Sequence, residues 1–173
     1  MQTMKTKKVI VTPYRETWPR DFEAIRAEIA AILKELALSI EHVGSTSVPG
    51  LSAKPIIDLD VVIRDYSVFP DICRKLESIG YFHEGNLGIP EREAFRYDGK
   101  PHLQKHHLYV CPRDSRELHR HMVFRDFLRS HPDAAKQYGA VKEAAAQLYP
   151  EDINGYMACK SACIEELYRQ CGL

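Results

Sequence analysis

The chain has 173 residues, 45% of them hydrophobic, and its 24 Lys and Arg residues balance 24 Asp and Glu residues. This length and composition are typical of one folded globular domain with a real core. A net charge of zero excludes binding to nucleic acid or membranes through bulk charge, but not a small basic site. The sequence shows no bilayer-length apolar run, no signal-peptide pattern and no CxxC pair among five cysteines, so we expect a cytoplasmic protein.

Hydrophobic periodicity over the first two thirds of the chain predicts alternating helices and strands. Helices are expected over residues 17–38 and 68–79, where apolar residues recur at helical spacing. A short extended segment is expected over 9–12, and strands over 39–43, 55–63, 81–83, 94–97 and 105–111. Residues 45–54 are rich in Ser, Gly and Pro, which indicates a loop.

Three helices are predicted after Pro112. Asp114 with Glu117 resembles a capping box for the first of them, and Asp152 is placed to cap the third. The chain has no repeat, low-complexity segment or flexible linker that would divide it. We therefore predict one α/β (α+β) domain over residues 1–173, with a sheet core in 1–112 and helices in 113–173 packed on that core.

The strand expected over 55–63 carries two carboxylates. Side chains alternate along a strand, so Asp58 and Asp60 share one face and apolar side chains occupy the other. Two adjacent acids repel, and their burial is costly without a counter-charge. Mg²⁺ or Mn²⁺ supplies that charge and commonly takes further ligands from water and substrate phosphates. The alternative is an edge strand whose acidic face meets water.

A Gly-Ser pair favours the metal site over this alternative. Gly44 and Ser45 are followed by twelve residues and then by Asp58-Leu59-Asp60. A glycine lets the backbone approach a phosphate closely, and the serine offers a hydroxyl and an N–H to phosphate oxygens. Metals held by the two aspartates would bridge the phosphates and the attacking oxygen.

This pattern resembles the DNA polymerase β-like nucleotidyltransferase superfamily, and the chain resembles the GrpB family within it. The segments that carry the GrpB resemblance are VTPYRETWPRDF, HVGSTSVPGLSAKPIIDLDVVI, GIPEREAFR, HHLYV and FRDFLRSHPDAAKQYGAVK, with Tyr156 and Lys160 after them. Several separate motifs in one order make the match specific. The resemblance implies a mixed β-sheet flanked by helices, a divalent cation as cofactor and a nucleoside triphosphate as substrate.

Two departures from the expected pattern concern the site. Active members of the superfamily usually carry a third carboxylate on a neighbouring strand, where this chain has His106 and His107. Histidine is a poorer ligand for Mg²⁺ and a better one for softer metals, so we assign His107 to the catalytic and metal set with Asp58 and Asp60. The loop also carries Glu91 where we expect a glycine, and Tyr109 stands where many members would carry histidine.

Further basic residues are candidates for the phosphates. Lys54 precedes the acidic strand, Arg92 lies in the GIPERE loop, and Arg125 follows in the first C-terminal helix. The alternative for Lys54 is a solvated loop lysine, and the alternative for Arg125 is a surface salt bridge. Arg96 is the alternative to Arg92 for the phosphate contact. Arginine suits phosphate because its planar guanidinium binds two oxygens at once.

Other polar residues are expected to play structural roles. We expect His42 in the core with a backbone partner, and Arg129 in surface salt bridges. His119 and His121 lack zinc-ligand spacing with any partner, so we expect both at the surface.

Three functions remain open from the sequence. The first is an enzyme that transfers a nucleoside monophosphate from a nucleoside triphosphate to a small molecule, RNA or protein. The second is a non-catalytic nucleotide- or metal-binding module, which the missing third acid keeps open. The third is an interaction domain with a vestigial pocket, which the intact Gly-Ser pair and both aspartates disfavour.

Overall fold

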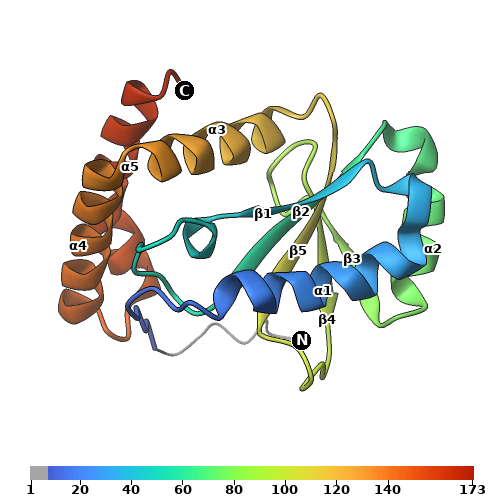
Figure 1. Cartoon of the computed structure of the whole chain (residues 1–173), viewed down its shortest axis with the longest axis horizontal. Coiled ribbons are helices and arrows are strands. Elements are labelled where there is room, and N and C mark those ends of the chain that lie inside the picture. The colour runs from blue at the N-terminus through green and yellow to red at the C-terminus, as the bar shows by residue number, and fades with distance from the viewer. Residues whose placement is uncertain (1–7) are drawn as a thin grey trace.

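The computed structural model describes residues 8–173 and places a five-stranded mixed sheet at the centre of the molecule (Figure 1). The strand order is β1-β2-β5-β4-β3, with bounds Ser39–Val43, Ile57–Ile63, His106–Pro112, Glu93–Tyr97 and Tyr81–Gly85. Strands β2 and β5 pair in parallel, and every other neighbouring pair is antiparallel. The predicted mixed sheet is confirmed, with strand ends within two residues of those expected.

Two helices cover one face of the sheet. These are α1 (Trp18–Leu33) and α2 (Phe69–Glu77), whose apolar stripes bury Ile25, Ile29 and Leu76 completely. The apolar face of β2 packs against them, as its alternation predicts; its fully buried members are Ile57, Leu59, Val61 and Ile63. Burial of each such side chain contributes about 1.5–3 kcal/mol, so this layer fixes β2 firmly and leaves its opposite face for Asp58 and Asp60.

The first helix is shorter than predicted. It ends at Leu33 because Lys34 takes a positive φ of 51°, and a 3₁₀ turn over Lys34–Leu36 leads into β1. The segment expected as extended over 9–12 contributes a single bridge, between Thr12 and Ala53.

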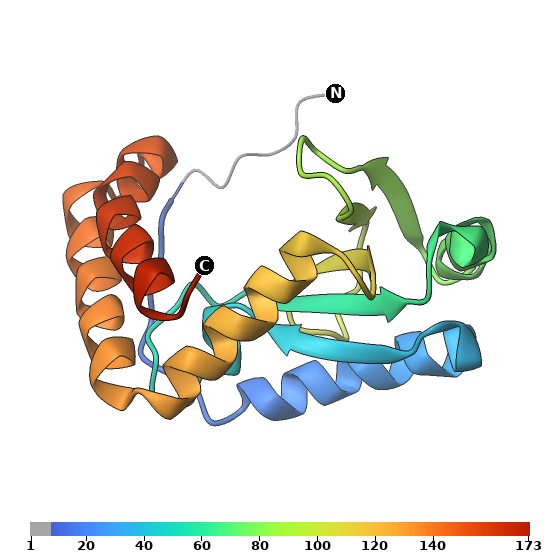
Figure 2. The same cartoon turned by 90° about the horizontal axis from the view of Figure 1, so that it is seen from above.

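Three helices follow β5, as predicted, with bounds Arg116–Ser130 (α3), Pro132–Leu148 (α4) and Ile153–Gln170 (α5). Figure 2 shows α3 crossing the sheet on the face opposite α1, while α4 and α5 lie together beyond one end of the sheet. The predicted capping box of Asp114 is wrong: Ser115 caps α3, since its hydroxyl accepts from the Leu118 N–H at 3.2 Å. The Asp152 cap of α5 is confirmed by a 3.0 Å bond from the Gly155 N–H.

A second apolar cluster joins the loop after β1 to the C-terminal helices. Val48 and Leu51 of the loop pack against Leu128, Tyr138 and Leu167, one from each of α3, α4 and α5. The loop between Gly44 and Ala53 is therefore held between the sheet and these helices. This contact brings residues of α4 and α5 opposite the polar face of β2.

Candidate functional site

The turn after β1 is built around Gly44. Its φ of 72° is a backbone conformation that favours glycine, and a Cβ at this position would lie 2.5 Å from Oδ2 of Asp58. Ser45 begins a 3₁₀ turn that continues to Ser47. The Gly-Ser pair predicted as a phosphate loop therefore lies directly against the first aspartate of β2.

His42, on β1, contacts this turn through its imidazole ring. Its ring stacks on Phe22 with centroids 4.6 Å apart, and its Nε2 lies 2.9 Å from the Thr46 hydroxyl. Burial lowers the pKa of His42 to about 4, so the imidazole is neutral. The histidine is buried as predicted, but its partner is a side-chain hydroxyl of the turn and not the backbone.

Asp58 faces a cavity of about 220 Å³ between the sheet and the C-terminal helices. The residues that line it are Ser45, Thr46, Ala53, Lys54, Ile56, Asp58, His107, Lys142, Tyr156, Met157 and Lys160. His107 is the register partner of Asp58 on β5, and its Nδ1 lies 2.9 Å from Oδ1 of Asp58. The structure thus brings together Ser45, Lys54, Asp58 and His107 of the predicted site.

Three lysines give this cavity a positive wall. Lys142 of α4 is only 2% exposed, and burial together with the charges of Lys160 and Lys54 lowers its pKa to about 7. Burial and Lys54 lower the pKa of Lys160 to about 8. Among the described residues none of the three lysines forms an ion pair. Clustered buried cations without acidic partners are costly, and an anion in the cavity would offset that cost.

Asp60 has a different environment from Asp58, although the two share a face of β2. Asp60 is fully buried and does not line the cavity. Its Oδ2 accepts a 2.6 Å hydrogen bond from Nδ1 of His121, whose Nε2 lies 3.2 Å from Glu117. Burial opposes charge on His121, but the bond to Asp60 outweighs it and raises the pKa of the imidazole. The expectation that His121 lies at the surface is wrong, because α3 places it directly over β2.

One oxygen of Asp60 has no partner. Its Oδ1 is buried and receives no hydrogen bond from any residue in the range 8–173. Burial is the main cause that raises the pKa of this carboxyl, and His121 opposes it. An unsatisfied buried carboxylate oxygen is costly, and a cation or a bound donor would satisfy it.

The predicted arginines lie outside the cavity. Arg92 stacks its guanidinium on the Tyr109 ring at 4.2 Å, on the same face of the sheet as Asp60, and its Nε is buried without a partner. Burial raises the pKa of Tyr109 to about 12, so its hydroxyl stays protonated. Arg92 is therefore close to the acidic pair but not in contact with the cavity beside Asp58.

Arg125 and Arg129 fasten the turn after β1. Arg125 bonds Glu41 at 2.9 Å and the His42 carbonyl at 3.2 Å, so its donors are committed to protein groups. Arg129 donates to the Ser47 carbonyl at 2.9 Å, which replaces the surface salt bridge expected for it. These contacts hold Arg125 beneath the Gly44 turn, outside the cavity beside Asp58.

Few side chains beside the cavity could act as metal ligands. Within residues 8–173 no group of three or more His, Cys, Asp or Glu side chains is arranged to hold a metal ion. Asp58, about one-third exposed beside His107, and the unpaired Oδ1 of Asp60 still offer hard oxygen donors. Mg²⁺ is often held by one or two carboxylates with waters and substrate phosphates, so these residues fit a cation that binds together with a phosphorylated ligand.

A protein-family model matches nearly the whole chain. The model of the family described as "GrpB protein" matches residues 8–170. The chain belongs to the GrpB family. It is similar to the UPF0157 protein YqkA of Bacillus subtilis, with 31% identity over 92% of this chain, and it spans 46% of that relative's length. The crystal structure of conserved protein GrpB from Enterococcus faecalis aligns with a TM-score of 0.82 at 37% identity, covering 94% of this chain and 96% of the other.

The sheet and its helices also resemble a nucleotidyltransferase. A MgGTP-bound crystal structure of the Cid1 poly(U) polymerase aligns with a TM-score of 0.55 and 11% identity over 78% of this chain and 44% of that one. At this identity the likeness concerns the fold alone. The predicted GrpB resemblance and nucleotidyltransferase-like fold are confirmed. In addition, each helix within residues 8–173 is too short or too polar to span a membrane.

Proposed function

We propose that this GrpB-family chain binds a nucleoside triphosphate with a divalent cation and transfers its nucleoside monophosphate to an acceptor. The observation that carries the proposal is the cavity where Ser45 and Asp58 face three lysines that form no ion pair within residues 8–173. A phosphate chain is the common anion whose charge matches such a wall. The nucleotidyltransferase-like fold supports the same proposal, since the MgGTP-bound Cid1 poly(U) polymerase has a similar fold.

The residues around the cavity take distinct roles in this proposal. Lys142 and Lys160 hold the phosphates that leave as pyrophosphate, and Lys54 neutralises charge at the cavity rim. The Gly44 turn lets phosphate oxygens approach Ser45. A metal held at Asp58 and Asp60 would stabilise charge on the α-phosphoryl oxygens. His107, beside Asp58, is placed to accept the proton of the attacking acceptor hydroxyl.

A second candidate is a binding module without catalysis. The observation that favours it is the bond between His121 and Asp60, which occupies one oxygen of the second aspartate. If that bond persists when nucleotide binds, Asp58 and His107 alone hold the cation. Binding would then occur without transfer.

The test compares binding with turnover. The purified chain is titrated calorimetrically with each nucleoside triphosphate in Mn²⁺ or Mg²⁺, and pyrophosphate release is measured with RNA, protein and small-molecule acceptors. Asp58→Asn is expected to reduce nucleotide affinity at least about tenfold, whereas Asp98→Asn, at an exposed carboxylate, should leave it unchanged. Binding without pyrophosphate release would favour the module, and absence of binding would reject both.

The proposal places the protein in the cytoplasm. All five cysteines are free, which fits a reducing compartment such as the cytoplasm. The chain spans under half of YqkA, so further segments in such relatives can supply the acceptor site.

A further inference from the structure

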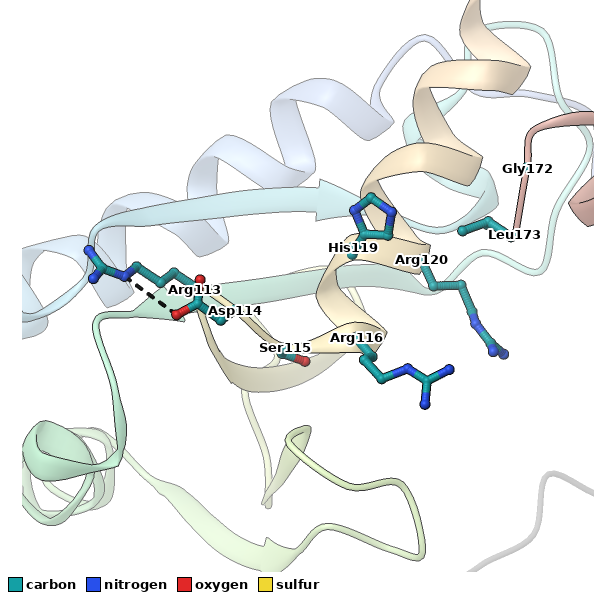
Figure 3. Close-up of a pocket in the computed structure, with 8 residues that line it drawn as sticks. All are labelled: Arg113, Asp114, Ser115, Arg116, His119, Arg120, Gly172 and Leu173. Atoms are coloured by element: carbon teal, nitrogen blue, oxygen red, sulfur yellow. Dashed lines mark ion pairs between the residues drawn. The ribbon is translucent and has the colours of Figure 1, made fainter.

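A basin separate from the lysine-lined cavity lies where α3 begins, next to the end of α5 (Figure 3). Its volume is about 600 Å³, and its lining residues are Arg113, Asp114, Ser115, Arg116, His119, Arg120, Gly172 and Leu173. It shares no lining residue with the cavity beside Asp58. Any ligand of this basin is therefore additional to the nucleotide of the proposed function.

Two arginines give the basin its charge. Arg116 and Arg120 are one helical turn apart, and Figure 3 shows their side chains extending to the same side of α3. Like charges at this spacing destabilise a helix. Neither arginine forms an ion pair with the residues from 8 to 173. The Arg120 guanidinium lies 5.4 Å from the ring centroid of Tyr168 on α5, a cation–π contact that helps to orient the Arg120 side chain.

The nearby carboxylates are engaged elsewhere. Asp114 pairs with Arg113 at 3.8 Å, on the far side of the basin from the two arginines (Figure 3). Glu117, between the arginines in sequence, turns inward and pairs with His121 at 3.2 Å. Within residues 8–173 neither Arg116 nor Arg120 has a carboxylate partner, so both guanidinium groups are available to an anionic ligand.

We propose that this basin binds a small molecule that carries two or more phosphate groups, through Arg116 and Arg120. Paired guanidinium groups match phosphate oxygens in geometry as well as charge. The volume lies in the range of small-molecule pockets, about 300–1,000 Å³.

Single-stranded nucleic acid fits the basin less well. Binding of that polymer relies on aromatic side chains on which bases stack, together with an extended basic groove. No Phe, Tyr or Trp lines the basin, and the whole chain has no net charge. The observations therefore favour a compact polyphosphorylated ligand over RNA.

The experiment follows backbone amide chemical shifts of the full chain during titration with inorganic tripolyphosphate. Saturable shifts are expected at residues 116–120. In the double variant Arg116→Gln/Arg120→Gln the affinity measured there should fall roughly a hundredfold, because two charge-assisted contacts are lost. The matched control Arg26→Gln/Arg74→Gln removes the same charge from exposed positions of α1 and α2 and should keep wild-type affinity.

The same spectra separate this proposal from the proposed function. Shifts around Ser45 report the lysine-lined cavity, and shifts at 116–120 report the basin, so either can fail alone. Absence of saturable shifts at 116–120, or equal affinity in the arginine variant, would overturn the proposal. A ten-nucleotide RNA that binds the basin more tightly than tripolyphosphate would overturn the small-molecule assignment.

Discussion

Asp58 and Asp60 stand two residues apart on one face of β2, yet their surroundings are opposite. Asp58 is about one-third exposed, beside His107, and faces a cavity whose far wall carries lysines. Asp60 is fully buried under α3, where His121 holds one of its oxygens. The difference shows that a strand fixes which way a carboxylate points, whereas the helices packed on the strand decide whether it meets a ligand or a protein partner.

The largest expected effect comes from removal of the buried acid. Asp60→Ala should lower the free energy of unfolding by about 3 kcal/mol, because it leaves His121 buried without its partner. Asp58→Ala should change it by less than about 1 kcal/mol, since that pair is half-exposed. Urea denaturation of both variants measures the contrast. Equal losses would show that the two acids share one environment, and the double variant Asp60→Ala/His121→Leu should recover part of the loss.

The second prediction addresses the positive wall opposite Asp58. Lys142 keeps its proton only up to a pH of about 7 when folded, against an ordinary value of 10.5. Between pH 7 and pH 10.5 the unfolded chain therefore binds more protons than the folded one, so the free energy of unfolding rises with pH across this window. Below pH 7 Lys142 is charged in both states, and the cost of burying its charge is fully present. Lys142→Met should stabilise the chain by about 2 kcal/mol at pH 6 and by much less at pH 10.

Thermal unfolding across this pH range checks the prediction. The control is Lys136→Met, on the exposed side of the same helix, which should show no such pH dependence. A stability gain from Lys142→Met that is equal at pH 6 and pH 10 would mean that the buried amine carries no charge penalty. Because Lys142 loses its proton as the pH rises above about 7, phosphate binding to the wild-type cavity should weaken over the same range.

The smallest effect is expected at His107. His107→Ala should change stability by no more than about 0.5 kcal/mol, because its contact with Asp58 is solvent-exposed. The variant should weaken Mn²⁺ binding more than Mg²⁺ binding, since imidazole suits softer metals. Metal titrations by calorimetry, in the presence of nucleotide, measure both. If the affinity for both metals is unchanged, His107 is not a metal ligand and only orients Asp58.

Much of the sheet face could be predicted from the sequence because strand periodicity is local. Alternation along 57–63 placed Asp58 and Asp60 opposite the apolar core. The family resemblance placed His107 on a neighbouring strand, and the register of β5 in the structure sets it beside Asp58. The need for a glycine at position 44 has a structural reason in the close approach of Asp58, while its predicted contact with phosphate stays a prediction. These inferences depend on a few neighbouring residues and on the geometry of one strand pair.

The helical side of the site could not be predicted in the same way. Helical spacing shows which residues share a face, but not which element that face meets. Lys142 resembles any surface lysine in sequence, and His121 has no ligand spacing to identify it, although both contact the polar side of the sheet. Arg125 was assigned to phosphate because it is basic, whereas its contacts with Glu41 and His42 depend on how α3 crosses β1.

The parallel pairing of β2 with β5 also has a consequence for how the protein folds. Asp58 and His107 are 49 positions apart, and their strands meet only after the intervening helix and the β3–β4 hairpin have found their places. Contacts of this sequence separation form slowly, because chain closure costs entropy before the contact offsets it. We therefore expect the Asp58–His107 pair to be a late event in folding, with φ-values near zero on that pair while α1 and its β1–β2 hairpin are already structured.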